Sequence, residues 1–140
     1  PGKPVRAHFS ILGAHSRVGL HVDGAFAGRH VFFDRTVRLH LPIETNEKCV
    51  FYVDGELFRM RTDEIWMINN RKTHAVINRG SSRLHLIVDL EPDARLLEWM
   101  DDSYPDESFE DEAMLKSIVE GPGFLERLQA RLHKLMTATK

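Results

Sequence analysis

Between residues 36 and 90 the sequence is a succession of short strand-like segments divided by turn residues, and this pattern limits the fold more than any other feature. The segments cover residues 36–43, 50–53, 56–60, 64–68 and 83–90. Asp54-Gly55 joins two of them as a two-residue hairpin, because this dipeptide tolerates the positive φ angles of such a turn. Many short strands with turns every 8–12 residues or so predict a mainly β sandwich or jelly-roll barrel.

Length and composition limit the other possibilities. The chain has 140 residues, which suffice for one hydrophobic core and are too few for two. A net charge of −2 gives no reason to expect a nucleic-acid partner. No stretch approaches the roughly 20 apolar residues that span a bilayer, so we expect no membrane partner. The single cysteine, Cys49, excludes an internal disulfide and fits a reducing compartment, so we expect a cytoplasmic protein.

The character of the chain changes after residue 92. We assign residues 1–92 to a β core, and residues 93–140 to an acidic loop and helices of the same domain. A capping box that starts at Ser108 predicts a helix through about Val119. Regularly spaced apolar residues predict a second amphipathic helix: Phe124, Leu125, Leu128, Leu132 and Leu135. We predict that these helices cover the outside of the barrel or form a homodimer interface.

Two of the expected strands combine a basic face with an aliphatic one. Side chains alternate along a strand, so Arg38 and His40 share one face of the first strand, and Arg83 and His85 share one face of the second. A solvent-exposed face would explain either strand alone. Arginine, however, is the side chain best shaped to bind a carboxylate through two hydrogen bonds. Two such strands facing one cavity would form a pocket for a small dianion.

A second group of residues is typical of metal ligands. In His21-Val22-Asp23 an imidazole and a carboxylate lie two residues apart, on one face of an extended segment. With His74 they would form the two-histidine, one-carboxylate triad of non-haem Fe(II) oxygenases, which leaves coordination positions open. Alternatively, Asp23 and Gly24 form a simple hairpin turn.

Three blocks of sequence resemble the aspartyl/asparaginyl β-hydroxylase family, which includes peptidyl hydroxylases and bacterial free-proline hydroxylases. These blocks are residues 38–49, 63–66 and 74–89, within a resemblance that runs from about Phe9 to Leu90. The resemblance implies a double-stranded β-helix, which is a cupin-like jelly roll, here followed by C-terminal helices.

The resemblance also implies roles for individual residues. His21, Asp23 and His74 match the iron ligands. Arg83 matches the arginine that pairs with the distal carboxylate of 2-oxoglutarate, and Ser10 matches a hydroxyl that assists it. Arg38 and His40 match the pair near the metal-chelating carboxylate. The interval from His74 to Arg83 is one residue shorter than expected, which places a deletion in the turn at 78–82.

The activity implied by the resemblance is that of an Fe(II)- and 2-oxoglutarate-dependent dioxygenase. It would use O₂ to hydroxylate a small-molecule or peptide substrate, either a peptidyl Asp or Asn or a free amino acid such as proline, and would release succinate and CO₂. Two alternatives remain: a cupin-type metalloenzyme that does not use 2-oxoglutarate, and a non-catalytic barrel that binds a small anion. Arg6 and Arg29 could meet a substrate carboxylate, but solvated arginines are the simpler interpretation.

Overall fold

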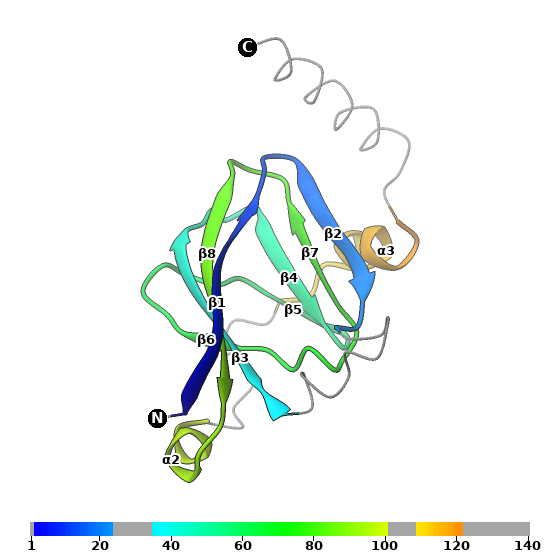
Figure 1. Cartoon of the computed structure of the whole chain (residues 1–140). Coiled ribbons are helices and arrows are strands. Elements are labelled where there is room, and N and C mark those ends of the chain that lie inside the picture. The colour runs from blue at the N-terminus through cyan, green and yellow to red at the C-terminus, as the bar shows by residue number, and fades with distance from the viewer. Residues whose placement is uncertain (1, 24–34, 101–108, 122–140) are drawn as a thin grey trace.

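Two antiparallel four-stranded sheets face each other in the computed structural model, which describes residues 2–23, 35–100 and 109–121 (Figure 1). The major sheet has the strand order β1-β8-β3-β6, and the minor sheet has the order β2-β7-β4-β5. The strands are β1 (Lys3–Leu12), β2 (Ser16–His21), β3 (Val37–Glu44), β4 (Cys49–Val53), β5 (Glu56–Phe58), β6 (Trp66–Met67), β7 (His74–Asn78) and β8 (Arg83–Glu91).

The path of the chain between the two sheets is that of a jelly roll. The chain alternates between the two sheets from β1 to β4 and again from β5 to β8, while the hairpin strands β4 and β5 lie in the same sheet. Every strand pairing in both sheets is antiparallel. The strand order therefore confirms the predicted mainly β, jelly-roll architecture. The predicted hairpin is also present, with positive φ angles of 50° at Asp54 and 106° at Gly55.

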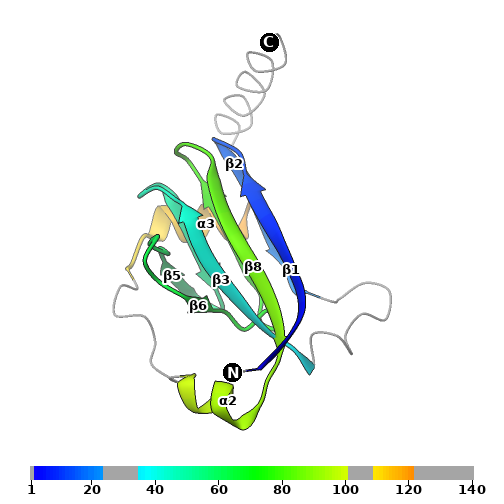
Figure 2. The ribbon, with the colours of Figure 1, turned by 60° about the vertical axis from the view of Figure 1, so that its left-hand side comes forward.

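The major sheet turns its polar face inward. Arg83 and His85 on β8 and His40 on β3 are all buried, with exposed fractions of 3%, 0% and 6%. The predicted alternation of faces is confirmed, but the interpretation of the basic face as solvent-exposed is wrong. The opposite, aliphatic face looks outward, and Phe9 and Ile11 on β1 are 66% and 73% exposed. Figure 2 shows β3, β8 and β1 side by side in this sheet.

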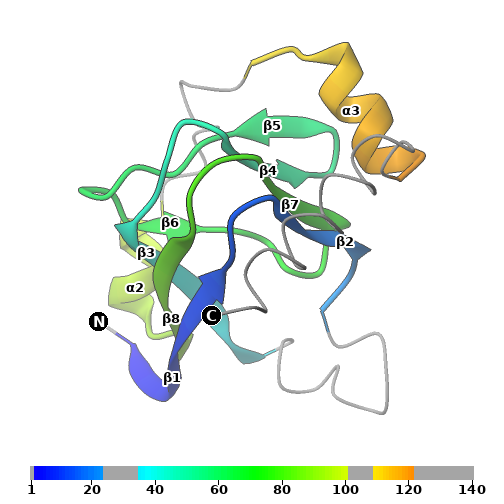
Figure 3. The same ribbon diagram turned by 90° about the horizontal axis from the view of Figure 1, so that it is seen from above.

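The minor sheet contributes to two apolar clusters. Between the sheets lie Leu12, Cys49, Phe51, Phe58, Met60, Ile68 and Val76. On its outer side, Val50, Leu57, Ala75 and Ile77 pack against Met114 and Ile118 of helix α3 (Glu112–Val119). Figure 3 shows α3 lying outside this sheet. The sequence prediction that C-terminal helices cover the barrel therefore holds for α3.

The helix boundaries differ from those expected. Helix α3 begins at Glu112, and its N-cap is Asp111, whose carboxylate accepts a hydrogen bond from the Met114 amide. The predicted start at Ser108 is therefore wrong by one turn, whereas the predicted end at Val119 is confirmed. A further short helix, α2 (Ala94–Trp99), follows β8 and is capped by Asp93. The predicted helix at 124–135 lies outside the described residues. No helix in the described part of the chain is long and apolar enough to cross a membrane.

Candidate metal centre

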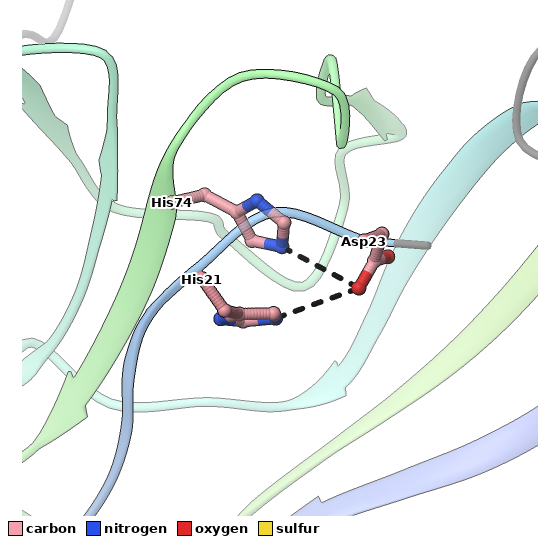
Figure 4. A group of neighbouring side chains, drawn as sticks. All are labelled: His21, Asp23 and His74. Carbon is pink, nitrogen blue, oxygen red and sulfur yellow. Dashed lines mark ion pairs between the residues drawn. The ribbon is translucent and has the colours of Figure 1, made fainter. Parts of the chain in front are cut away.

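Three side chains that are distant in sequence meet at one end of the minor sheet. His21 ends β2, His74 opens β7, and the two are direct partners in the strand register. Asp23 follows two residues after β2. One potential ligand atom from each of these residues lies within 4.8 Å of the other two. Asp23 Oδ1 is 3.5 Å from His21 Nε2 and 3.9 Å from His74 Nε2, and Figure 4 shows both imidazoles directed at it.

Backbone carbonyls orient both imidazoles. His21 Nδ1 lies 2.8 Å from the carbonyl oxygen of Gly19, and His74 Nδ1 lies 2.9 Å from that of Lys72. A carbonyl oxygen can only accept a hydrogen bond, so in each ring Nδ1 carries the proton. The lone pair of each Nε2 is then available to a metal ion. Burial lowers the pKa of His74, and the charge of His21 lowers it further, against the Lys72 carbonyl and Asp23, which raise it. This favours the neutral, ligating form.

The two oxygens of the Asp23 carboxylate have different surroundings. Oδ2 accepts hydrogen bonds from Arg38 Nη1 at 2.5 Å and from Asn70 Nδ2 at 2.9 Å. Oδ1 faces the two imidazoles. The backbone amide of Asp23 also donates to the Asn70 carbonyl at 3.0 Å, which fixes the chain just after β2. The alternative interpretation of Asp23 as a mere turn residue does not account for these contacts.

A second polar group lies deeper between the sheets. Six buried nitrogen atoms of Arg83, His40 and His85 have no hydrogen-bond partner in the described part of the chain: Arg83 Nε and Nη1, and both ring nitrogens of each histidine. Burial lowers the pKa of Arg83. Burial, with Arg83 nearby, also lowers the pKa of both His40 and His85 to about 3. Polar atoms that are buried without partners are rare in native proteins, so this group is well suited to receive an anion.

Side chains of β4 and β1 lie beside this buried polar group. Burial raises the pKa of the Cys49 thiol, although the nearby Arg83 opposes that shift. The ring of Phe51 stacks on His85 with centroids 5.7 Å apart. Ser10 is the register partner of His85, so its hydroxyl lies on the same face of the major sheet as Arg83.

Arg38 has a different environment from its neighbour His40. Its Nε donates to Asp89 Oδ1 at 2.8 Å, while Nη1 reaches Asp23. Arg6 also binds Asp89, with its Nη2 2.6 Å from Oδ2. Arg6 is thus solvent-exposed, as expected, with a side chain that is 43% exposed, but it also makes this ion pair, and Arg29 lies outside the described residues. Burial raises the pKa of Asp89, but the hydrogen bonds and charges of Arg38 and Arg6 outweigh it, so the pKa is lowered overall.

Sequence reasoning did not find Asp89, Asn70 or Cys49 as members of these sites. Asp89 offered a signal, because it is an acidic residue on the same strand face as Arg83 and His85. Asn70 and Cys49 carried no pattern that separates them from ordinary turn and core residues.

Comparison with known proteins decides the family. The sequence model of aspartyl/asparaginyl beta-hydroxylase matches residues 2–92, which include every strand from β1 to β8. The chain belongs to the aspartyl/asparaginyl beta-hydroxylase family. The resemblance seen in the sequence is thus confirmed, and the metal-ligand candidates and the buried polar group around Arg83 all lie within the matched part of the chain.

Among solved structures, the chain is similar to a predicted oxalate decarboxylase from Thermotoga maritima. The sequence identity is 16%, over 64% of this chain and 69% of that chain, and the TM-score is 0.46. A likeness at this level carries no information about the function of this aspartyl/asparaginyl beta-hydroxylase family member.

The donor set of His21, Asp23 and His74 fits a divalent transition metal. Two neutral imidazole nitrogens and one carboxylate oxygen form a set that suits Fe(II), whereas magnesium and calcium prefer oxygen ligands. Each histidine also has the hydrogen-bond partner expected of a metal ligand, because its Nδ1–H donates to a backbone carbonyl.

Proposed function

We propose that this protein is an Fe(II)- and 2-oxoglutarate-dependent dioxygenase that hydroxylates an amino acid, either an Asp or Asn within a peptide or a free amino acid such as proline. The observation that carries the proposal is the presence, in one jelly roll, of a two-histidine, one-carboxylate cluster and of a buried arginine whose Nε and Nη1 are unpaired in the described chain. The first arrangement suits iron and the second suits a small carboxylic acid.

Each residue has a definite task in this proposal. His21, Asp23 and His74 would hold the iron. Arg83 would bind the distal carboxylate of 2-oxoglutarate with help from the Ser10 hydroxyl, and His40 and Arg38 would lie near the carboxylate that approaches the metal. When bound, iron supplies the oxygen chemistry, in which 2-oxoglutarate and O₂ give succinate and CO₂ and a substrate C–H becomes C–OH.

The buried polar group around Arg83 favours 2-oxoglutarate over neutral co-substrates. A guanidinium in a low-dielectric interior attracts an anion more strongly than one in water does. His40 and His85, with pKa values lowered to about 3, are neutral at physiological pH and can each offer one N–H donor. This buried group therefore combines one fixed positive charge with neutral donors, which matches a carboxylate that needs several hydrogen bonds.

The activity can be tested directly. Purified protein supplied with Fe(II), ascorbate and 2-oxoglutarate should release succinate slowly even without a substrate. The reason is that the side chains proposed to bind iron and 2-oxoglutarate already lie together in the fold. His74→Ala should abolish succinate release while the circular dichroism spectrum stays unchanged. His15→Asn, which alters an exposed histidine in the β1–β2 turn, is the matched control and should behave like the wild type.

The substrate requires a separate search. We expect that incubation with amino-acid and peptide libraries will give a product heavier by one oxygen atom, detected by mass spectrometry. Absence of both succinate and hydroxylated product over a broad panel would favour the other two functions. Metal binding without 2-oxoglutarate binding would indicate a different cupin-type metalloenzyme, and anion binding without metal binding would indicate a non-catalytic barrel.

A further inference from the structure

A row of charged side chains crosses the major sheet and reaches the candidate metal ligand Asp23. Asp89 lies on β8, and in the register it faces Arg6 on β1 and Arg38 on β3. Its carboxylate is completely buried and binds both arginines. The guanidinium of Arg38 then uses its other edge to reach Asp23. Arg38 thus connects the buried carboxylate of Asp89, which is not a candidate metal ligand, to the carboxylate of Asp23, which is one.

The contacts of Arg38 divide its donors between the two carboxylates. Nε lies 2.8 Å from Asp89 Oδ1 and Nη2 lies 3.4 Å from Asp89 Oδ2, while Nη1 lies 2.5 Å from Asp23 Oδ2. The guanidinium is planar and its donors have fixed directions. Holding one edge on Asp89 therefore sets the direction in which the remaining donor points. The side chains of Arg38 and Asp23 are only 13% and 16% exposed, so water competes little for these bonds.

We propose that Asp89 is a positioning residue that fixes Arg38 so that Asp23 offers a single oxygen to the metal. Arg38 and Asn70 together occupy Oδ2, which leaves Oδ1 facing the two imidazoles. A carboxylate that bound through both oxygens would fill two coordination positions. Reserving one oxygen keeps another position open for exogenous ligands. This inference rests on the metal site proposed above.

Co(II) is the probe for the test, because its visible absorption reports both affinity and coordination. We expect Asp89→Asn to weaken Co(II) binding by about 10- to 100-fold, as is usual for groups that orient metal ligands, and to change the shape of the absorption band. Arg6→Gln is the matched control. It removes the other partner of Asp89, leaves the contact between Arg38 and Asp89 intact, and should preserve both the affinity and the band.

The outcomes separate the two proposals. If the wild type does not bind Co(II), the metal site itself is wrong. If the wild type binds and Asp89→Asn has the same affinity and spectrum, the site stands and the positioning role is overturned. A third result is that Asp89→Asn binds Co(II) more weakly with an unchanged absorption band, while Arg6→Gln binds it more tightly. This would mean that Asp89 acts only through its charge, and it would also overturn the positioning role.

A second variant covers the case in which Asp89→Asn does not fold. Arg38→Lys keeps the positive charge, but an ammonium group cannot bridge two carboxylates in the fixed geometry of a guanidinium. We expect the same loss of affinity and the same change in the band. Wild-type affinity and spectrum in Arg38→Lys would overturn the proposal.

Discussion

Arg83 is a charged residue inside a protein interior, and its burial has an energetic cost. Its exposed fraction is 3%, and its Nε and Nη1 have no partner in the described residues. Arg83→Met should therefore stabilise the ligand-free protein by about 1–3 kcal/mol, because it removes an unsatisfied buried group. If 2-oxoglutarate binds as proposed, it should raise the melting temperature of the wild type, and the same change should remove this rise. Thermal unfolding with and without 2-oxoglutarate measures both effects.

The control for this prediction is Arg79→Met, which changes an exposed arginine near the start of the β7–β8 turn. It should leave both the stability and the response to 2-oxoglutarate unchanged. If Arg83→Met keeps the full response to 2-oxoglutarate, the anion binds somewhere else.

His85 should make the stability of the fold depend on pH. Burial, with Arg83 nearby, lowers its pKa from the ordinary value of 6.5 to about 3. Between these two values the unfolded chain binds a proton that the folded chain excludes. The contribution of the neutral ring is therefore complete above about pH 6.5 and is lost as the pH falls toward 3. From pH 7 to pH 5 the loss should be about 2 kcal/mol.

This prediction is checked by denaturant unfolding of metal-free protein at both pH values. His85→Leu should have a smaller loss of stability between pH 7 and pH 5, because it lacks this titrating ring. His8→Leu, at an exposed position on β1, should keep the loss seen in the wild type. An equal loss in His85→Leu and in the wild type would show that other groups cause the pH dependence.

Among single residues, the sequence predicted the side chains that gather on the inner face of the major sheet better than the residues that hold those side chains in place. Arg38, His40, Arg83 and His85 followed from the alternation of side chains along a strand. The role of Asp89 could not follow from that rule, because it depends on β8 lying between β1 and β3. Neither strand order nor register can be read from a single strand.

The turn between β7 and β8 is fixed by amide side chains. Asn78 is buried, and its Nδ2 donates to the carbonyls of Leu12, Gly13 and Ser81. Asn46 donates to Asn78 Oδ1 and to the Ser81 carbonyl. These bonds stabilise the turn in which the sequence had placed a deletion.

Gly80 should be essential to this turn. A Cβ atom at this position would lie 2.1 Å from Asn46 Oδ1, so the amide would have to move and lose its hydrogen bonds. We expect Gly80→Ala to lower the free energy of unfolding by about 1–3 kcal/mol. Gly19→Ala, where the added atom would have no neighbour within 4 Å, should have little effect. Chemical denaturation of both variants tests this, and equal stabilities would contradict it.

Among the elements, hairpins were predicted more accurately than helix starts. Asp54-Gly55 predicted its turn because few other dipeptides accept two positive φ angles. Both Ser108 and Asp111 are good N-caps, so local sequence could not choose between them. The choice of Asp111 accompanies the packing of Met114 and Ile118 on the minor sheet, a tertiary effect.

On the scale of the whole molecule, the major sheet is unusual because its aliphatic side faces solvent. Phe9 and Ile11 on β1 are 66% and 73% exposed. The alternation in the sequence showed the two faces, but it could not show which face lies inside, because that depends on where the second sheet packs. The predicted homodimer through C-terminal helices stays a prediction.

This outer face should bind hydrophobic dyes. We expect the wild type to enhance the fluorescence of anilinonaphthalene sulfonate, because contiguous exposed apolar surface binds such probes. The double change Phe9→Ser and Ile11→Thr should reduce the enhancement. Val119→Ser, which removes an isolated exposed apolar residue on α3, should not reduce it. Equal fluorescence in all three proteins would mean that the dye binds elsewhere.

Many β-sandwiches are filled by their own apolar side chains, whereas the middle of this one contains Arg83, His40 and His85. A small dicarboxylic acid bound among them would complete the interior, so a metabolite would serve as a removable piece of the folded structure. In a cell depleted of that metabolite, the chain would unfold more often and meet proteases sooner. Nutrient supply would then govern how long each molecule survives as well as how fast it works.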